Sequence, residues 1–93
     1  MEKREKVVEK MCECIFKDRQ NTYGTPEDNF QTIADFWNIY LHNGDDIINK
    51  QDVAVMMMLL KIARMKSSPE HLDNYVDAAG YAVIAGSFVN DKK

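Results

Sequence analysis

Apolar residues recur at helical spacing along most of this 93-residue sequence, and no segment alternates apolar and polar residues as a β-strand does. The spacing predicts one all-α domain, residues 1–93, whose four helices cover about residues 2–18, 26–43, 50–66 and 69–89. Short helices joined by short turns favour a four-helix bundle-like fold. A chain of this length buries only somewhat more than about 60% of its unfolded surface. We therefore expect oligomerisation to complete the fold.

Three of the four helices have recognisable start signals. In TPED, residues 25–28, Thr25 can cap a helix whose first residue is the following proline, and SPEH, residues 68–71, repeats this pattern with Ser68. Asn49 and Asp52 have the spacing of a capping box. The periodicity then predicts these core-facing residues: Val8, Met11 and Ile15; Phe30, Ile33, Ala34, Trp37, Tyr40 and Leu41; Leu72, Tyr75, Val76, Ala79 and Val83.

The third helix carries the run VAVMMMLL, residues 53–60, which is apolar all round. A helix without a polar side has to be buried on every side, and one small four-helix subunit rarely buries a member so completely. The run predicts a homo-oligomer that assembles through helix 53–65. Because methionine fills irregular gaps, residues 56–58 are equally consistent with core packing inside one subunit.

Charge and composition exclude several classes of protein. A net charge of −3 disfavours binding to nucleic acid, and no apolar run approaches the roughly 20 residues that span a membrane. The first ten residues lack the apolar stretch of a secretory signal, so we expect a cytoplasmic protein. Cys12 and Cys14 project to different sides of a helix and are expected to be reduced thiols. His42 and His71 lack the spacing of zinc ligands.

The most distinctive polar pattern lies on the last two helices. Asp73 and Asp77 are four residues apart, so their carboxylates share one side of the fourth helix, and Gly80 follows one turn later. Lys61 and Arg64 share a face near the end of the third helix. Two interpretations remain open. The four charged residues either pair with one another across the turn, or they surround an anionic ligand.

The ligand interpretation has a specific chemistry. Two carboxylates suit Mg²⁺, which proteins hold through one or two acids and substrate phosphates, while Lys61 and Arg64 would bind the phosphates. Tyr81, one turn beyond Asp77, and either Trp37 or Tyr23 could provide a flat surface for a base. Gly80 would give access or a close helix contact.

The segments NTYGTPEDNF, DVAVMMMLLKIAR and HLDNYVDAAGYA resemble a family of small phage and prophage proteins without a named function. The resemblance covers about residues 19 to 86 and suggests that Tyr23 and Asn29 line the same pocket as Asn74, a hydrogen-bonding residue between the two aspartates. It also implies the cytoplasm of a prokaryotic or phage-infected host cell. The matching residues are Arg19, Tyr23, Gly24, Asn29, Phe30, Trp37, Asp52, Val53, Lys61, Arg64, His71, Asp73, Asn74, Asp77, Gly80 and Tyr81.

More remotely, the last two helices resemble the MazG-like all-α nucleotide pyrophosphohydrolases. This likeness implies an oligomeric helical bundle that hydrolyses nucleoside triphosphates with Mg²⁺, held by Glu-x-x-Glu on one helix and a motif like Glu-x-x-Asp on the next. Here Asp52 is the acid of the first motif, whereas Val55 and Met56 occupy the positions one turn on. The candidate metal ligands of such an enzyme are Asp73, Asp77 and Asp52, and Glu27, Asp28 or a neighbouring subunit would have to complete the set.

Three functions follow from these observations. The favoured one is an oligomeric binder that needs no cofactor and captures a nucleotide or nucleotide-derived signal between the last two helices, sequestering it from host defence. The predicted ligand-binding residues of this binder are Lys61, Arg64, Asp73, Asn74, Asp77, Tyr81, Asn29 and Tyr23. The second is a Mg²⁺-dependent nucleoside triphosphate pyrophosphohydrolase. The third is a protein-interaction module without a small-molecule ligand.

Overall fold

The computed structural model describes residues 2–18, 24–44 and 47–90. Regular secondary structure in these residues is helical throughout: α1 (Lys3–Cys12), its π-helical continuation η1 (Glu13–Asp18), α3 (Pro26–Tyr40), α4 (Lys50–Ser67) and α5 (Leu72–Ser87). The prediction of an all-α chain is confirmed, and α1 together with η1 forms the first of the four helices.

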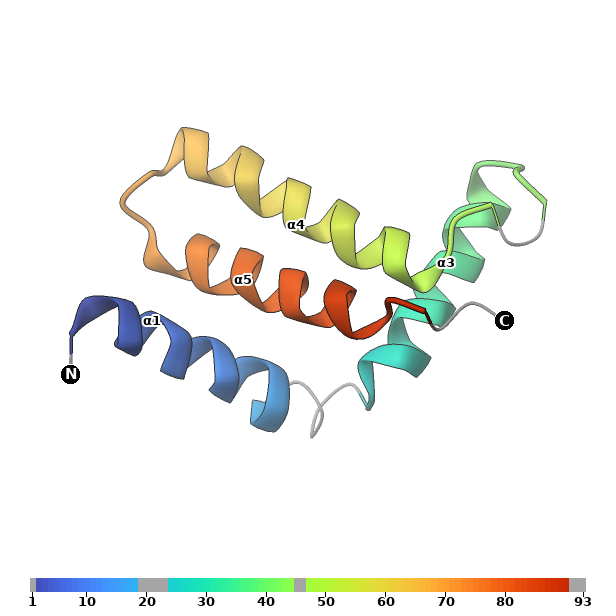
Figure 1. The fold of residues 1–93 in the computed structure, drawn as a ribbon. Coiled ribbons are helices and arrows are strands. Elements are labelled where there is room, and N and C mark those ends of the chain that lie inside the picture. Colours follow the sequence, from blue (N-terminus) through green and yellow to red (C-terminus); the bar gives the residue numbers. More distant parts are fainter. Residues whose placement is uncertain (1, 19–23, 45–46, 91–93) are drawn as a thin grey trace.

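Helix α5 lies between α1 and α4, and it contacts both (Figure 1). Helix α4 runs antiparallel to α5 and is joined to it by a tight turn, while α1 lies along the opposite side of α5. Helix α3 crosses the end of this layer, where α4 begins and α5 ends (Figure 1). Within the described residues the number of helices is as predicted, but three of them form a layer that is more open than a closed four-helix bundle.

Two of the predicted helix starts are confirmed by their hydrogen bonds. The Thr25 hydroxyl oxygen accepts from the backbone N–H of Asp28 at 3.3 Å, which caps α3. Asn49 and Asp52 form the predicted capping box of α4, because each side chain accepts from the backbone N–H of the other, at 2.8 and 3.0 Å. These short-range signals involve only residues within one turn, so the sequence reveals them directly.

The predicted start of the last helix at Ser68 is wrong. Ser68 terminates α4, because its backbone N–H donates to the Arg64 carbonyl at 2.8 Å, and α5 begins at Leu72. The intervening residues reverse the chain direction, with the N–H of His71 donating to the Ser68 carbonyl. The Tyr75 hydroxyl donates to the Pro69 carbonyl at 2.8 Å and holds this turn against α5. These residues form the turn that connects the two antiparallel helices, so the packing of α4 against α5 prevails over the local capping signal.

Helix α3 ends earlier than predicted, at Tyr40 instead of about residue 43. His42 takes the left-handed conformation, with φ of 58°, and its N–H donates to the Ile39 carbonyl. The next N–H, from Asn43, donates to the Asn38 carbonyl at 3.0 Å. This pair of bonds is a Schellman motif. Histidine therefore occupies the left-handed position at the end of the helix that glycine most often fills.

Burial follows the predicted stripes in part. Met11, Ile15, Phe30, Ala34 and Val76 are buried as predicted. Helix α5 also buries apolar residues that lie outside its predicted stripe. The reason is that α5 has neighbours on two sides, so one amphipathic stripe does not describe it. The additional buried apolar residues are Val53, Ala54, Ala78, Ile84, Ala85 and Phe88, and the predicted core residues that are exposed are Val8, Tyr40, Leu41, Leu72, Tyr75 and Val83.

Asn38 is a buried polar residue that the periodicity did not single out. Its amide nitrogen donates to the Ile48 carbonyl and its amide oxygen accepts from the Ile48 N–H, both at 2.9 Å. Buried backbone groups outside a helix need such partners. The Asn38 side chain therefore fixes the segment that leads into α4 against α3.

Gly80 is required by the close contact between α5 and the first helix. A Cβ atom at this position would lie 2.9 Å from Cγ2 of Ile15, so Gly80→Ala has to displace a branched, buried side chain. Overpacking of this kind costs about 1–3 kcal/mol, against a gain in helix propensity of about 1 kcal/mol. We expect Gly80→Ala to lower the free energy of unfolding by up to about 2 kcal/mol in urea denaturation.

Gly86 offers a matched control in the same helix, because no atom beyond its chain neighbours and the nearby backbone of its own helix lies within 4 Å of its added Cβ. Gly86→Ala should therefore raise the free energy of unfolding by about 0.5–1 kcal/mol. Both variants are compared with the parent at one protein concentration. Equal stabilisation by the two substitutions would contradict the close contact at Gly80.

Candidate ligand-binding site

The α4–α5 hairpin brings the predicted charged residues of both helices to one end of the molecule. They surround an open hollow of about 480 Å³. Five of the eight predicted ligand-binding residues line it, together with three residues of the connecting turn and its flanks. The complete lining is Lys61, Arg64, Ser67, Ser68, His71, Asp73, Asn74 and Asp77.

One ion pair spans the two helices within the hollow. Nζ of Lys61 lies 2.9 Å from Oδ2 of Asp77, and the two side chains are 14% and 34% exposed. This contact is one of the two pairs that the ion-pair interpretation predicts. Arg64 and Asp73 do not complete the second, because both are exposed and neither forms an ion pair in the part of the chain that the structure describes. The hollow therefore presents one cation and one carboxylate that remain available to a ligand.

Asn74 is the least exposed residue of the hollow, with 4% of its surface accessible. Its backbone N–H donates to the His71 carbonyl, but among the described residues its side-chain amide has no hydrogen-bond partner. Most buried side-chain polar groups do have a partner, because an unpaired one costs about 1–3 kcal/mol. An amide in this condition that lines a hollow is suited to bind a polar group of a ligand.

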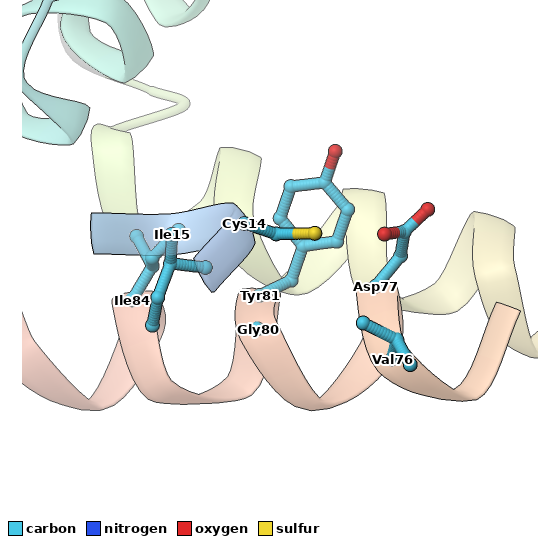
Figure 2. A pocket seen from close by; sticks show the side chains of 7 residues that line it. All are labelled: Cys14, Ile15, Val76, Asp77, Gly80, Tyr81 and Ile84. Atoms are coloured by element: carbon cyan, nitrogen blue, oxygen red, sulfur yellow. The ribbon is translucent and has the colours of Figure 1, made fainter. Parts of the chain in front are cut away.

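A second, smaller cavity of about 50 Å³ shares Asp77 with the hollow. Figure 2 shows the Asp77 carboxylate and the Tyr81 ring on the same side of α5, with Cys14 of η1 beside the ring. Gly80 of α5 also lines this cavity. A cavity of this size holds one or two water molecules. It is too small for a nucleotide.

Three predicted ligand residues do not line the hollow. Tyr81 lines the smaller cavity, and its ring packs 6.2 Å from that of Phe30, as part of the core. Asn29 is half-buried in the first turn of α3 and borders neither cavity. Tyr23 lies outside the described residues. Trp37, the other candidate for stacking on a base, lines a separate apolar groove with Tyr40, Leu41 and Met56.

The three candidate metal ligands are not gathered in one subunit. Asp52 stands nine residues before Lys61, about 13 Å along α4, and its carboxylate accepts from the Asn49 N–H. Asp77 is engaged by Lys61, and Asp73 is exposed. In residues 2–18, 24–44 and 47–90, no group of three or more His, Cys, Asp or Glu side chains could hold a metal ion. The described carboxylates of one subunit therefore do not come together as the predicted Mg²⁺ site.

The sequence did not single out Ser67, Ser68 and His71 as parts of a site. A usable signal was present, since an antiparallel helix hairpin places its connecting turn at the same end as the last residues of α4 and the first of α5. The segment between Arg64 and Asp73 therefore had to border any ligand held by both.

We also find no helix, over the residues that the structure describes, with the length and apolarity to cross a membrane.

The polar residues of the hollow lie within the part of the chain that is similar to known phage proteins. The Gene 55 protein of Mycobacterium phage D29 is 40% identical over 78 residues, and that of Mycobacterium phage L5 is 43% identical over 72 residues. These matches cover 84% and 77% of this chain but 50% and 45% of the relatives, so the chain spans about half the length of the curated relatives it matches. No solved structure matches.

The similarity confirms the predicted kinship with phage proteins. A family model also matches nearly the whole chain, residues 6–89, including every residue that lines the hollow. The chain therefore belongs to the family described as a domain of unknown function, DUF6378.

Proposed function

We propose that this protein is an oligomeric binder that holds a nucleotide or a nucleotide-derived signal in the hollow between α4 and α5 without cleaving it. The observation that carries the proposal is the Asn74 side chain, which is buried at the hollow and has no hydrogen-bond partner among the described residues. Most buried side-chain amides that have a structural role alone are paired. A ligand that presents a donor and an acceptor would satisfy it.

The other lining residues suit the remaining parts of a nucleotide. The Arg64 guanidinium can bind a phosphate with two parallel hydrogen bonds, and it is exposed beside the hollow. The Asp73 carboxylate can accept from a ribose hydroxyl. Lys61, which forms an ion pair with Asp77, adds a second cation to the lining of the hollow. A volume of about 480 Å³ lies in the range of small-molecule sites, roughly 300–1,000 Å³.

Binding without cleavage is favoured by the carboxylates. The remote MazG-like resemblance points to nucleotides, but hydrolysis between phosphates requires charge neutralisation that such enzymes obtain from several metal-bound acids. One subunit does not gather three such acids within the described residues. A protein that holds a nucleotide unaltered lowers its free concentration. Since relatives of this chain are phage proteins, we propose that it sequesters a signal of a host defence system.

The test is incubation of the purified protein with a panel of nucleoside triphosphates, cyclic nucleotides and ADP-ribose-type nucleotides, with and without Mg²⁺. Native mass spectrometry identifies the bound species, and chromatography identifies any product. We expect an unaltered nucleotide to be retained. Pyrophosphate and monophosphate formed only with Mg²⁺ would instead establish the pyrophosphohydrolase, and neither retention nor turnover would favour the protein-interaction module.

Arg64→Gln is expected to weaken binding of the retained nucleotide at least about tenfold, because a charge-assisted contact to phosphate contributes about 1.5–3 kcal/mol. Lys66→Gln is the matched control, since Lys66 is an exposed cation two residues away on α4 that does not line the hollow. It should change the affinity by less than about threefold. Titration calorimetry measures both. Equal losses for the two variants would mean that only the general charge of α4 attracts the ligand.

A further inference from the structure

The side of α4 that faces away from α5 is apolar and exposed. Four apolar residues share this side because their spacing follows the turns of the helix: Val55, Met56, Leu59 and Ile62. Each of the four is between 38% and 56% exposed. Lys61, whose Nζ contacts Asp77 of α5, lies on the other side of α4, and Val53 and Ala54 near the start of the helix are fully buried. One subunit therefore covers only one side of the apolar run that its sequence contains.

The apolar surface continues from α4 onto the end of α3. A groove of about 390 Å³ lies between the two helices, and aromatic and aliphatic side chains line it: Trp37, Tyr40, Leu41 and Met56. Met56 belongs both to the groove and to the outer side of α4. We call these residues together the α3–α4 apolar face: Trp37, Tyr40, Leu41, Val55, Met56, Leu59 and Ile62.

The surface of one chain is larger than a compact monomer of its mass exposes. The accessible area is 6654 Å², whereas roughly 5,500 Å² is typical of a folded monomer of 10.8 kDa. The radius of gyration is 14.3 Å, against about 12 Å for a compact domain of this length. The excess area, roughly 1,100 Å² over the whole chain, is of the same order as the roughly 800 Å² that each partner contributes to a standard protein–protein interface.

We infer that the α3–α4 apolar face is covered by the same face of a second copy of this chain, related by a two-fold axis. A two-fold dimer pairs identical patches, so one self-complementary face is sufficient, and large side chains of one copy can enter the groove of the other. The inference rests on the proposed function only in taking the protein to be an oligomer. None of the residues of the hollow belongs to the face, so both hollows of the dimer stay accessible.

The experiment measures the mass of the purified chain by light scattering at micromolar concentration, without any nucleotide. We expect twice the 10.8 kDa of one chain. Leu59→Glu places a charge in the middle of the face and should reduce the mass to that of one chain. Val8→Glu is the matched control, because Val8 is 53% exposed on α1 and Leu59 is 56% exposed on α4. This control should remain a dimer.

Circular dichroism verifies that Leu59→Glu keeps its helices. If it does not, Tyr40→Glu decides the question, because Tyr40 is 81% exposed at the groove and has little to contribute to the fold of one subunit. A wild-type mass of one chain would overturn the dimer and leave the face to a different protein partner. If Val8→Glu dissociates the dimer and Leu59→Glu does not, the subunits do not meet through the α3–α4 apolar face, and the proposed location of the interface is wrong. Because no nucleotide is present, neither result depends on the ligand.

Discussion

Phe30→Ala is expected to lower the free energy of unfolding by about 3–5 kcal/mol, the cost of truncating a fully buried aromatic side chain. Phe30 has no exposed surface, and its ring lies 6.2 Å from that of Tyr81 and 6.3 Å, edge to face, from that of Phe88. These two residues belong to α5 and to the turn that follows it. Removing the ring therefore loosens the attachment of α3 to the rest of the molecule. Small domains have a total stability of about 5–15 kcal/mol, so the loss is severe.

Phe16→Ala is the control for this prediction, because the Phe16 ring is 60% exposed on η1. It should change the free energy of unfolding by less than about 0.5 kcal/mol. Urea titrations followed by circular dichroism give both values at one protein concentration. Similar losses for the two variants would contradict the placement of Phe30 at the centre of the core.

The helix starts show where local sequence signals are sufficient and where they are not. Thr25 and Asn49 each cap the helix that the sequence predicts, because a capping hydrogen bond joins residues only three positions apart. Ser68 is followed by proline and glutamate in the same pattern, yet it ends α4. Its conformation is set by the packing of α4 against α5, which brings together residues distant in sequence. A window of four residues contains no information about that contact.

The sequence predicted burial along α5 only in part. Val76 lies on the predicted stripe and is buried, whereas Tyr75 and Val83, on the same predicted stripe, are partly exposed. Periodicity shows that a helix is amphipathic but not how many helices contact it. Gly80 was the available clue to the second contact, since a glycine inside a helix reduces stability unless another element approaches closely.

The polar hollow was predictable because its charged residues flank one short turn. Lys61 and Asp77 could be paired from the antiparallel connection alone, and they form the observed ion pair. Asp52 was assigned to the site by the remote resemblance, and it lies at the other end of α4. The condition of Asn74 could not be inferred, because whether an amide is buried and unpaired depends on the side chains that surround it. That property emerges only from the folded structure.

The two buried asparagines provide the sharpest test of the proposed site. Asn38 is 5% exposed and makes hydrogen bonds with both its nitrogen and its oxygen, whereas Asn74 is 4% exposed and, within the described residues, its amide makes none. Leucine has the same branched arrangement of four side-chain heavy atoms as asparagine. Asn38→Leu should therefore lower the free energy of unfolding by about 2–3 kcal/mol, because the N–H and carbonyl of Ile48 lose their partners.

Asn74→Leu is expected to behave oppositely in the same urea titration. Replacing an unpaired buried amide by an apolar group leaves the free energy of unfolding unchanged or raises it by up to about 2 kcal/mol. The nucleotide retained by the parent should nevertheless bind at least about tenfold more weakly, since its polar group then faces a leucine. A loss of stability like that of Asn38→Leu would show that the Asn74 amide has a structural partner. Unchanged affinity in a stable variant would show that the ligand does not contact Asn74, and the proposed site would then lose its main support.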